Sequence, residues 1–135
     1  MRRSAGEWAR DERYSWAVCE PTTGEMLGEV DLRTLDRPSG TAEASCWALP
    51  PARRRGMTST ALAAVLRFAF GGVGLQRVTY AWAHGNTASE RVAHKCGFRV
   101  EGLQRSAWVV DGRRVDVHVA ARLATDELTA DHTRS

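Results

Sequence analysis

The chain has 135 residues, 43% of them apolar and 26% charged, which fits one domain with a core and excludes wholesale disorder. Its 19 basic and 16 acidic residues leave a net charge of +3, too small an excess to indicate a nucleic-acid-binding protein. No apolar run follows Arg2 and Arg3, so we predict neither a signal peptide nor a membrane span.

Three strands are predicted in the first fifty residues, over 14–20, Met26–Arg33 and about Ala42 to Leu49. Pro50 and Pro51 end the third strand, because proline cannot extend a hydrogen-bonded ladder. In the second strand, alternation predicts two opposite faces, with Met26, Val30 and Leu32 on one and Glu29, Asp31 and Arg33 on the other. Together the strands would form an antiparallel meander.

An amphipathic helix is predicted after the arginine run at residues 53–55. Its apolar residues recur with the spacing i, i+3, i+4 and i+7, and they are Leu62, Val65, Leu66 and Ala69. We expect Gly71 and Gly72 to end this helix.

A second β-α unit follows. β-Branched and aromatic residues predict a strand over Arg77–Ala83. A short helix is expected from Thr87, because Thr87 and Glu90 have the spacing of a capping box. Gly97 occupies the position of a C-terminal cap.

A hairpin that opens at Phe98 completes the predicted fold, with Asp111-Gly112 as a strong two-residue turn signal. After Leu123 the chain is polar and is expected to fray. The order β-β-β-α-β-α-β-β predicts an α+β fold with a mixed, mostly antiparallel sheet and one parallel pair joined by a right-handed crossover.

The cysteines and histidines bear on compartment and metal binding. Cys19, Cys46 and Cys96 are odd in number and lack a CxxC pair, which favours a reducing cytoplasm over a disulfide framework. None of the four histidines has a partner at metal-ligand spacing. We therefore expect a cytoplasmic protein with no metal and no membrane contact.

The segment 51–58 (PARRRGMT) lies between a strand end and a helix start. Backbone N–H groups at a helix N-terminus attract anions, and Gly56 would let the backbone approach one closely. Arg53, Arg54 and Arg55 add positive charge. The alternative is a solvated arginine run that binds nothing.

Together with residues 86–98, this segment resembles the GNAT superfamily of acyl-CoA-dependent N-acyltransferases. The family signature Q/R-x-x-G-x-G/A, which holds the CoA pyrophosphate, matches Arg53-x-x-Gly56-x-Thr58. The pattern N-x-x-S from Asn86, followed by K-x-G-F, is similar to the branch that includes ribosomal-protein alanine N-acetyltransferases. Segments 42–51, 101–105 and 111–116 fit the same branch. The resemblance covers about residues 14–123 and implies a single GNAT-like domain over residues 1–135.

Two departures from the family pattern stand out. Thr58 adds bulk where Gly or Ala is usual, although its N–H remains available. The chain begins at what resembles the second strand of the family, so the first strand and the helices that wall the acceptor pocket have no counterpart. Either another chain supplies that wall, or the pocket is open, or the protein is a truncated member of the family, active or inactive.

The resemblance implies acetyl-CoA as co-substrate. Its pyrophosphate would lie on the loop from Arg53 through Met57 to Thr58, and its pantetheine arm would lie between two splayed strands. Backbone groups near Trp47 and Leu49 and the side chain of Asn86 would bind that arm. For Asn86, a simple helix cap is the alternative.

The resemblance also implies catalytic groups. Many members use a Tyr on the second helix as the acid, and the matching position here is Ala93. Ser89 is the substitute that this branch offers, with a bond to the backbone of the first helical turn as the alternative. Glu43 is the candidate general base, unless it is simply an exposed strand carboxylate.

Several other residues are candidates for these roles. Asp116 and His118 are the runners-up for the base. Trp82 and Trp108 would line the acceptor side, or else belong to the core or a sheet face. Cys46 and Cys96 are interpreted as small buried apolar residues and not as nucleophiles.

The leading functional hypothesis is direct transfer of an acetyl group from acetyl-CoA to a primary amine, either a protein N-terminus or a small molecule. A non-catalytic CoA-binding or dimerisation module is the alternative, and a nucleic-acid contact through the arginines is disfavoured because no basic stripe accompanies them. Large aromatic residues near the N-terminus, with Phe68, favour a homodimer or partner chain over a monomer closed by residues 1–13.

Overall fold

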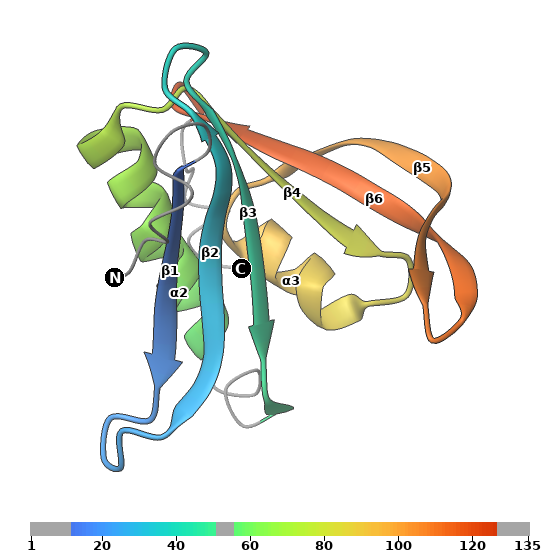
Figure 1. The fold of residues 1–135 in the computed structure, drawn as a ribbon, viewed down its shortest axis with the longest axis horizontal. Coiled ribbons are helices and arrows are strands. Elements are labelled where there is room, and N and C mark those ends of the chain that lie inside the picture. The colour runs from blue at the N-terminus through green and yellow to red at the C-terminus, as the bar shows by residue number, and fades with distance from the viewer. Residues whose placement is uncertain (1–11, 51–55, 127–135) are drawn as a thin grey trace.

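The computed structural model describes residues 12–50 and 56–126 (Figure 1). Its elements in chain order are β1 (Glu12–Cys19), β2 (Met26–Asp36), β3 (Thr41–Ala48), α2 (Met57–Arg67), η2 (Phe68–Val73), β4 (Arg77–Ala83), α3 (Thr87–Lys95), β5 (Arg99–Val110) and β6 (Arg113–Leu123). The predicted element order is confirmed.

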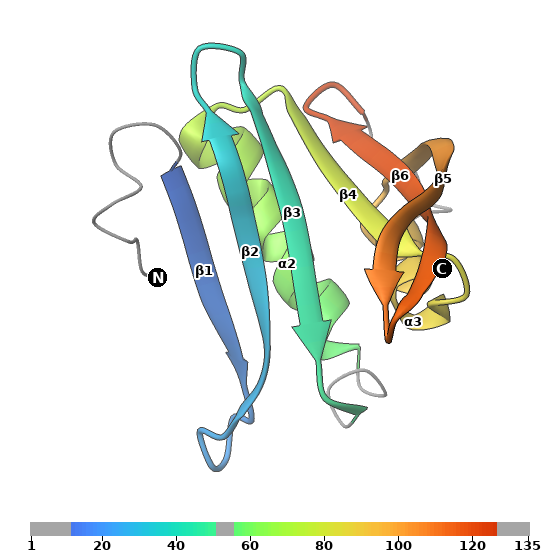
Figure 2. The same cartoon turned by 45° about the vertical axis from the view of Figure 1, so that its right-hand side comes forward.

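One six-stranded sheet runs β1-β2-β3-β4-β6-β5, and only the pairing of β3 with β4 is parallel. Helix α2 packs against β1, β2 and β3, while α3 packs beside it behind β4 (Figures 1 and 2). The α+β class with a mixed, mostly antiparallel sheet is therefore confirmed.

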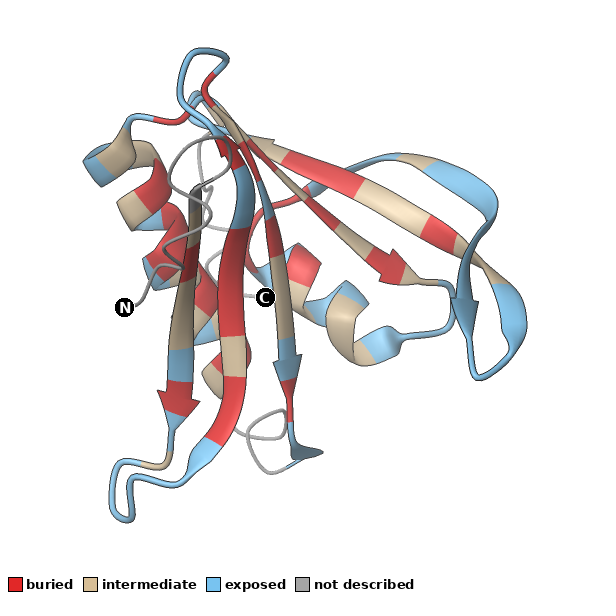
Figure 3. Cartoon of the chain, viewed as in Figure 1, coloured by how far each residue is buried: buried red, intermediate tan, exposed pale blue. Residues whose placement is uncertain are grey.

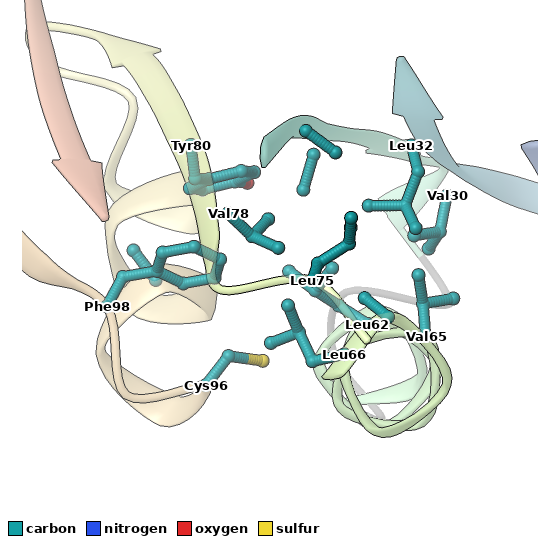
Figure 4. Packing of buried hydrophobic residues seen from close by; sticks show 14 of the residues in the cluster. Val30, Leu32, Leu62, Val65, Leu66, Leu75, Val78, Tyr80, Cys96 and Phe98 are labelled. Atoms are coloured by element: carbon teal, nitrogen blue, oxygen red, sulfur yellow. The ribbon is translucent and has the colours of Figure 1, made fainter. Parts of the chain in front are cut away.

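The core lies between this sheet and its two helices. Leu62, Val65, Leu66 and Ala69 are all at most 4% exposed, as their helical spacing predicted. They meet side chains of the central strands and the end of α3 in one cluster (Figure 4). Burial is concentrated in β1–β4 and on the inner helix faces, whereas β5 is exposed along most of its length (Figure 3).

The predicted end of the first helix is wrong. The chain passes through Gly71 and Gly72 as the wider helix η2 and ends at Gly74, whose φ of +84° is left-handed. Glycine keeps its backbone N–H, so it permits a helix to continue, whereas a left-handed residue turns the chain away.

The predicted alternation of β2 is confirmed at Val30 and Leu32, which are fully buried, and is wrong at its start. Met26 is 43% exposed, because the register shifts where Cys19 pairs with Met26, and Leu27 turns inward instead. Asp31 is also buried, and its hydrogen bond raises the pKa of the neighbouring Glu29.

The second helix begins at Thr87, as predicted, but Thr87 is not its cap. Asn86 is the cap, since its side-chain oxygen accepts the Ser89 N–H at 3.1 Å. Gly97 has the left-handed φ of +79° that was expected of the C-terminal cap. At the hairpin, Asp111 and Gly112 both have positive φ, as a two-residue turn of this kind requires.

The aromatic residues behind the dimer prediction pack against one another. Ring centroids lie 5.6–5.9 Å apart among Tyr14, Trp16 and Phe68. Tyr14 is buried, so it offers little apolar area to a partner. Trp8 lies outside the described residues.

Gly28 is expected to be essential for stability. A Cβ built there would lie 2.5 Å from the Trp47 carbonyl oxygen on the facing strand. Gly28→Ala should therefore lower the free energy of unfolding by about 1–3 kcal/mol, the usual cost of overpacking. Urea unfolding measures this change, with Gly71→Ala as the control because nothing lies within 4 Å of its Cβ position. Equal midpoints for Gly28→Ala and the parent would contradict the expectation.

Candidate functional site

The central feature is a gap between β3 and β4. The two strands pair only from Thr41 with Arg77 to Ala44 with Tyr80, and beyond that point they diverge (Figures 1 and 2). Each strand keeps its other neighbour beyond that point, since β4 pairs with β6 as far as Ala83 and β3 pairs with β2 as far as Ala48. The splay expected from the resemblance is confirmed.

A pocket of about 180 Å³ opens into this gap from the helix side, and we call it the helix-side pocket. It is lined by Cys46, Trp47, Ala48, Gly56, Thr58, Ser59, Asn86, Ala88, Ser89, Arg91, Val92 and Lys95. The fold thus brings together five residues that the sequence singled out as binding residues: Trp47, Gly56, Thr58, Asn86 and Ser89.

Two other residues of the predicted binding set do not line this pocket. Met57 packs against the small buried cluster of Leu27 and Ala48. Leu49 is 44% exposed, and its N–H already donates to the Leu27 carbonyl at 2.8 Å. Residues Arg53–Arg55 are outside the described residues.

The start of α2 supplies the polar end of the pocket. Gly56 has φ +68° and ψ +18°, and its carbonyl accepts the hydroxyls of Ser59 and Thr60. Thr58 is 4% exposed, and its hydroxyl has no hydrogen-bond partner. The free N–H groups of this turn and the helix dipole favour an anion at this place.

Two cations that sequence reasoning missed face this helix start. Arg91 and Lys95 lie one turn apart on α3, and the Lys95 Nζ is 3.9 Å from the Cβ position of Gly56. Their i, i+4 spacing in the sequence is the signal that would have placed both cations on one face of the helix. The described part of the chain therefore builds a cationic rim without the arginines of residues 53–55.

A phenol that sequence reasoning also missed lies at the floor of the gap. The Tyr80 hydroxyl is 3.1 Å from the Cys46 sulfur. Burial raises the pKa of Tyr80 far above its usual range, so the phenol keeps its proton. No sequence signal identifies it, since an aromatic residue in a strand usually belongs to the core.

Of the two cysteines that were interpreted as small buried residues, only Cys96 is fully buried. Cys96 is buried, and burial raises the pKa of its thiol to about 12, which makes it inert as a nucleophile. Cys46 is half-buried and lines the pocket, because it follows the point where β3 leaves β4. Burial raises its thiol pKa as well.

On the opposite face of the sheet, a groove of about 430 Å³ reaches the same gap, and we call it the open-face groove. Glu43 lies in it and accepts a hydrogen bond from the Thr34 hydroxyl at 2.8 Å. Arg77 and Glu101 face each other across the groove in a two-bond ion pair, which lowers the pKa of Glu101. Trp108 also lines the groove and is 42% exposed, so it lies on a sheet face and not in the core.

The runners-up for the base lie outside both cavities. His118 stacks on Trp82 and shares a 3.0 Å hydrogen bond with His84. The Asp116 carboxylate accepts the Ser106 N–H at 2.8 Å and so fixes the bend in β5. Trp82 is 3% exposed, so it belongs to the core.

Metal and membrane features are lacking in the part of the chain that the structure describes. Within residues 12–50 and 56–126, no three His, Cys, Asp or Glu side chains gather where a metal ion could bind. Among the described helices, none has the length and apolar character needed to cross a membrane.

Known proteins resemble this chain in sequence. A family model described as an acetyltransferase (GNAT) domain matches residues 1–99. The uncharacterized N-acetyltransferase YoaA of Bacillus subtilis is 28% identical over 104 residues, which is 77% of this chain and 59% of YoaA. YdaF of the same organism, provisionally named a ribosomal N-acetyltransferase, is 30% identical over 94 residues, or 70% of this chain and 51% of YdaF.

A solved structure of an acetyltransferase also resembles this chain. The crystal structure of a probable acetyltransferase superposes with a TM-score of 0.71 at 29% identity, covering 74% of this chain and 56% of that one. The chain thus spans between half and three-fifths of the length of these relatives.

Proposed function

The chain belongs to the GNAT acetyltransferase family, and we propose that it is an N-acetyltransferase that moves the acetyl group of acetyl-CoA directly to a primary amine. One observation carries the proposal: two cavities, one on each face of the sheet, border the gap between β3 and β4, with Cys46 lining one and Ser45 and Tyr80 lining the other. A thioester entering from one face and an amine entering from the other would meet there.

The helix-side pocket suits acetyl-CoA. The start of α2 at Gly56 and the cations Arg91 and Lys95 would hold the pyrophosphate, with the adjacent arginines 53–55 adding charge. The diverging edge of β3 next to Trp47, at Cys46 and Ala48, would offer backbone groups to the amide-rich pantetheine arm, since the Trp47 carbonyl itself faces Gly28 on β2. Asn86 uses its side-chain oxygen as a helix cap, so only its amide NH₂ is left for that arm.

The open-face groove suits the acceptor. An alkyl ammonium must lose a proton before it can attack, and we propose that the Glu43 carboxylate accepts it. The Thr34 hydroxyl occupies one carboxylate oxygen of Glu43 and thereby orients the other. On the helix side, Ser89 would donate a hydrogen bond to the departing sulfur.

For the acceptor we propose a chemical class, the primary amines, and not one molecule. The name of YdaF refers to a ribosomal substrate, so a protein N-terminus is the first acceptor to test, with small amines second. Three free cysteines agree with a reducing cytoplasm as the place of this reaction. We regard residues 1–135 as one such domain.

The test is a thiol-release assay with acetyl-CoA. The acceptor is either a peptide with an N-terminal alanine or a small primary amine, each in a separate reaction. Free CoA and a singly acetylated product, in equal amounts, are expected with at least one acceptor. Tight binding of acetyl-CoA without product in any arm would instead identify a non-catalytic CoA-binding module.

We also propose that the protein forms a homodimer. Support now comes from β5, an edge strand on which Val100, Leu103 and Val109 are 50–60% exposed. Such an edge can pair with a second chain. Light scattering across a dilution series should give twice the chain mass at high concentration. A monomer mass at every concentration would rule the dimer out.

A further inference from the structure

Two arginines and two glutamates are among the side chains that line the open-face groove. Arg77 and Glu101 neutralise each other, because Nη1 and Nη2 of Arg77 donate to the two carboxylate oxygens of Glu101 at 2.9 and 2.7 Å. Arg33 and Glu43 behave differently. They are direct partners in the register of β2 and β3, which lie side by side (Figure 2), yet no ion pair joins them.

A bulge in β2 gives Glu43 another partner. The register shifts between Arg33 and Asp36, and Thr34 has a φ of +47°, a left-handed conformation that is rare for a β-branched residue. A bulge re-aims a side chain, and here the Thr34 hydroxyl donates to Oε2 of Glu43 at 2.8 Å. Within residues 12–50 and 56–126, no hydrogen bond or ion pair holds the Arg33 guanidinium.

Two opposite charges that are neighbours but are not paired can bind a ligand that carries both. Side chains directly opposite each other in an antiparallel pair have Cβ atoms about 4.5–5.5 Å apart. A glutamate oxygen accepts hydrogen bonds from an ammonium group, and a guanidinium forms two parallel hydrogen bonds with a carboxylate. The two charges of such a ligand must therefore lie close together, within about one or two residues of chain.

We infer that the acceptor is an amine with a carboxylate close to it, and that Arg33 is the residue that selects this carboxylate. The inference rests on the proposed function, since it names a substrate class within the primary amines. The ammonium group of the acceptor would lie on Glu43, and its carboxylate on Arg33. Two sources share this chemistry: a free amino acid, and a peptide with Asp or Glu next to its N-terminal residue.

This placement also turns the amine towards the gap. Ala44 is the last residue of β3 that pairs with β4, so Glu43 lies at the closed end of the gap. Arg33 belongs to β2, one strand farther from β4. A carboxylate held on Arg33 would therefore leave the amine as the part of the acceptor nearest to the thioester, and such orientation of reacting groups raises the rate of transfer.

The test uses pairs of acceptors that differ in the carboxylate. One arm compares the C-terminally amidated peptides Ala-Asp-Ala and Ala-Asn-Ala, and the other compares alanine with alaninamide. The parent should show a KM about tenfold lower for the acid than for the amide in at least one arm, because a hydrogen bond to a charged group is lost with the amide. High salt should reduce this preference, since the Arg33 side chain is exposed.

Three variants show whether Arg33 causes the preference. Arg33→Gln should remove it without changing the KM for acetyl-CoA, because Arg33 does not line the helix-side pocket. Arg33→Glu should reverse it, so that the amide of each pair becomes the better acceptor. Arg67→Gln is the matched control, since Arg67 is exposed on α2 and lines neither cavity, and it should keep the parental preference.

The arms also distinguish the sources. A preference among the peptides alone would identify an acidic N-terminal segment, and a preference for alanine alone would identify a free amino acid. Equal KM values within both pairs, or a preference that survives in Arg33→Gln, would overturn the inference while leaving the proposed function standing. If Arg33 were merely structural, Arg33→Gln would lower thermal stability and keep the preference. Absence of acetyl transfer to every acceptor would overturn the proposed function and the inference with it.

Discussion

Gly56→Val is expected to abolish acetyl-CoA binding while the fold persists. Gly56 has φ +68°, a left-handed conformation that costs an L-residue about 1–2 kcal/mol. The added methyl groups would also enter the space between the start of α2 and Lys95, where the pyrophosphate is proposed to lie. Calorimetry should show an affinity at least about 100-fold weaker, since strain and lost contacts each reduce it.

The matched control is Gly24→Val. Gly24 also has a positive φ, of +76°, but its turn between β1 and β2 lies outside the helix-side pocket and nothing lies within 4 Å of its Cβ position. It should therefore reproduce the backbone strain without the loss of affinity. Parental affinity in Gly56→Val would show that the start of α2 does not hold the ligand.

Glu43→Gln is expected to lower kcat about 100-fold, the usual minimum for loss of a general base. Glutamine keeps the shape and the hydrogen bond from Thr34, but it cannot take the proton of the amine. Steady-state kinetics should show this fall in kcat without a matching rise in the KM for acetyl-CoA, because Glu43 lies on the other face of the sheet.

The pH dependence separates a base from a binding residue. Without a base, the variant can use only amine that is already neutral, so its rate should rise about tenfold per pH unit below the pKa of the amine. Glu25→Gln, in the exposed turn before β2, is the control and should behave as the parent does. A rate defect that is the same at every pH would remove Glu43 from the role of base.

Local patterns predicted the architecture well, because each element carries its own periodicity. The spacing of Leu62, Val65 and Leu66 defines a helix face, and the alternation from Val30 to Leu32 defines a strand face. Asp111-Gly112 specifies a turn by itself. The errors fell at element ends, as at Met26 and Gly71, where register and packing with other segments decide the outcome.

The site was only partly predictable, because some of its residues lie in local motifs and others meet only through the tertiary fold. Gly56, Asn86 and Ser89 lie in short segments with a recognisable spacing, and the fold gathers them in one pocket. Tyr80 and Cys46 acquire their contact only because β3 leaves β4 just past Tyr80, a tertiary event that neither strand encodes alone.

The short parallel ladder between β3 and β4 also has a mechanical consequence. Only four residue pairs join β1–β3 to β4–β6 within the sheet, and the rest of the connection is side-chain packing, of α2 beside α3 and within one core cluster that spans both halves. Close packing of that cluster, more than backbone hydrogen bonds, therefore sets how far the two strands part beyond Tyr80. A substitution in the shared core would alter the opening on both faces of the sheet at once.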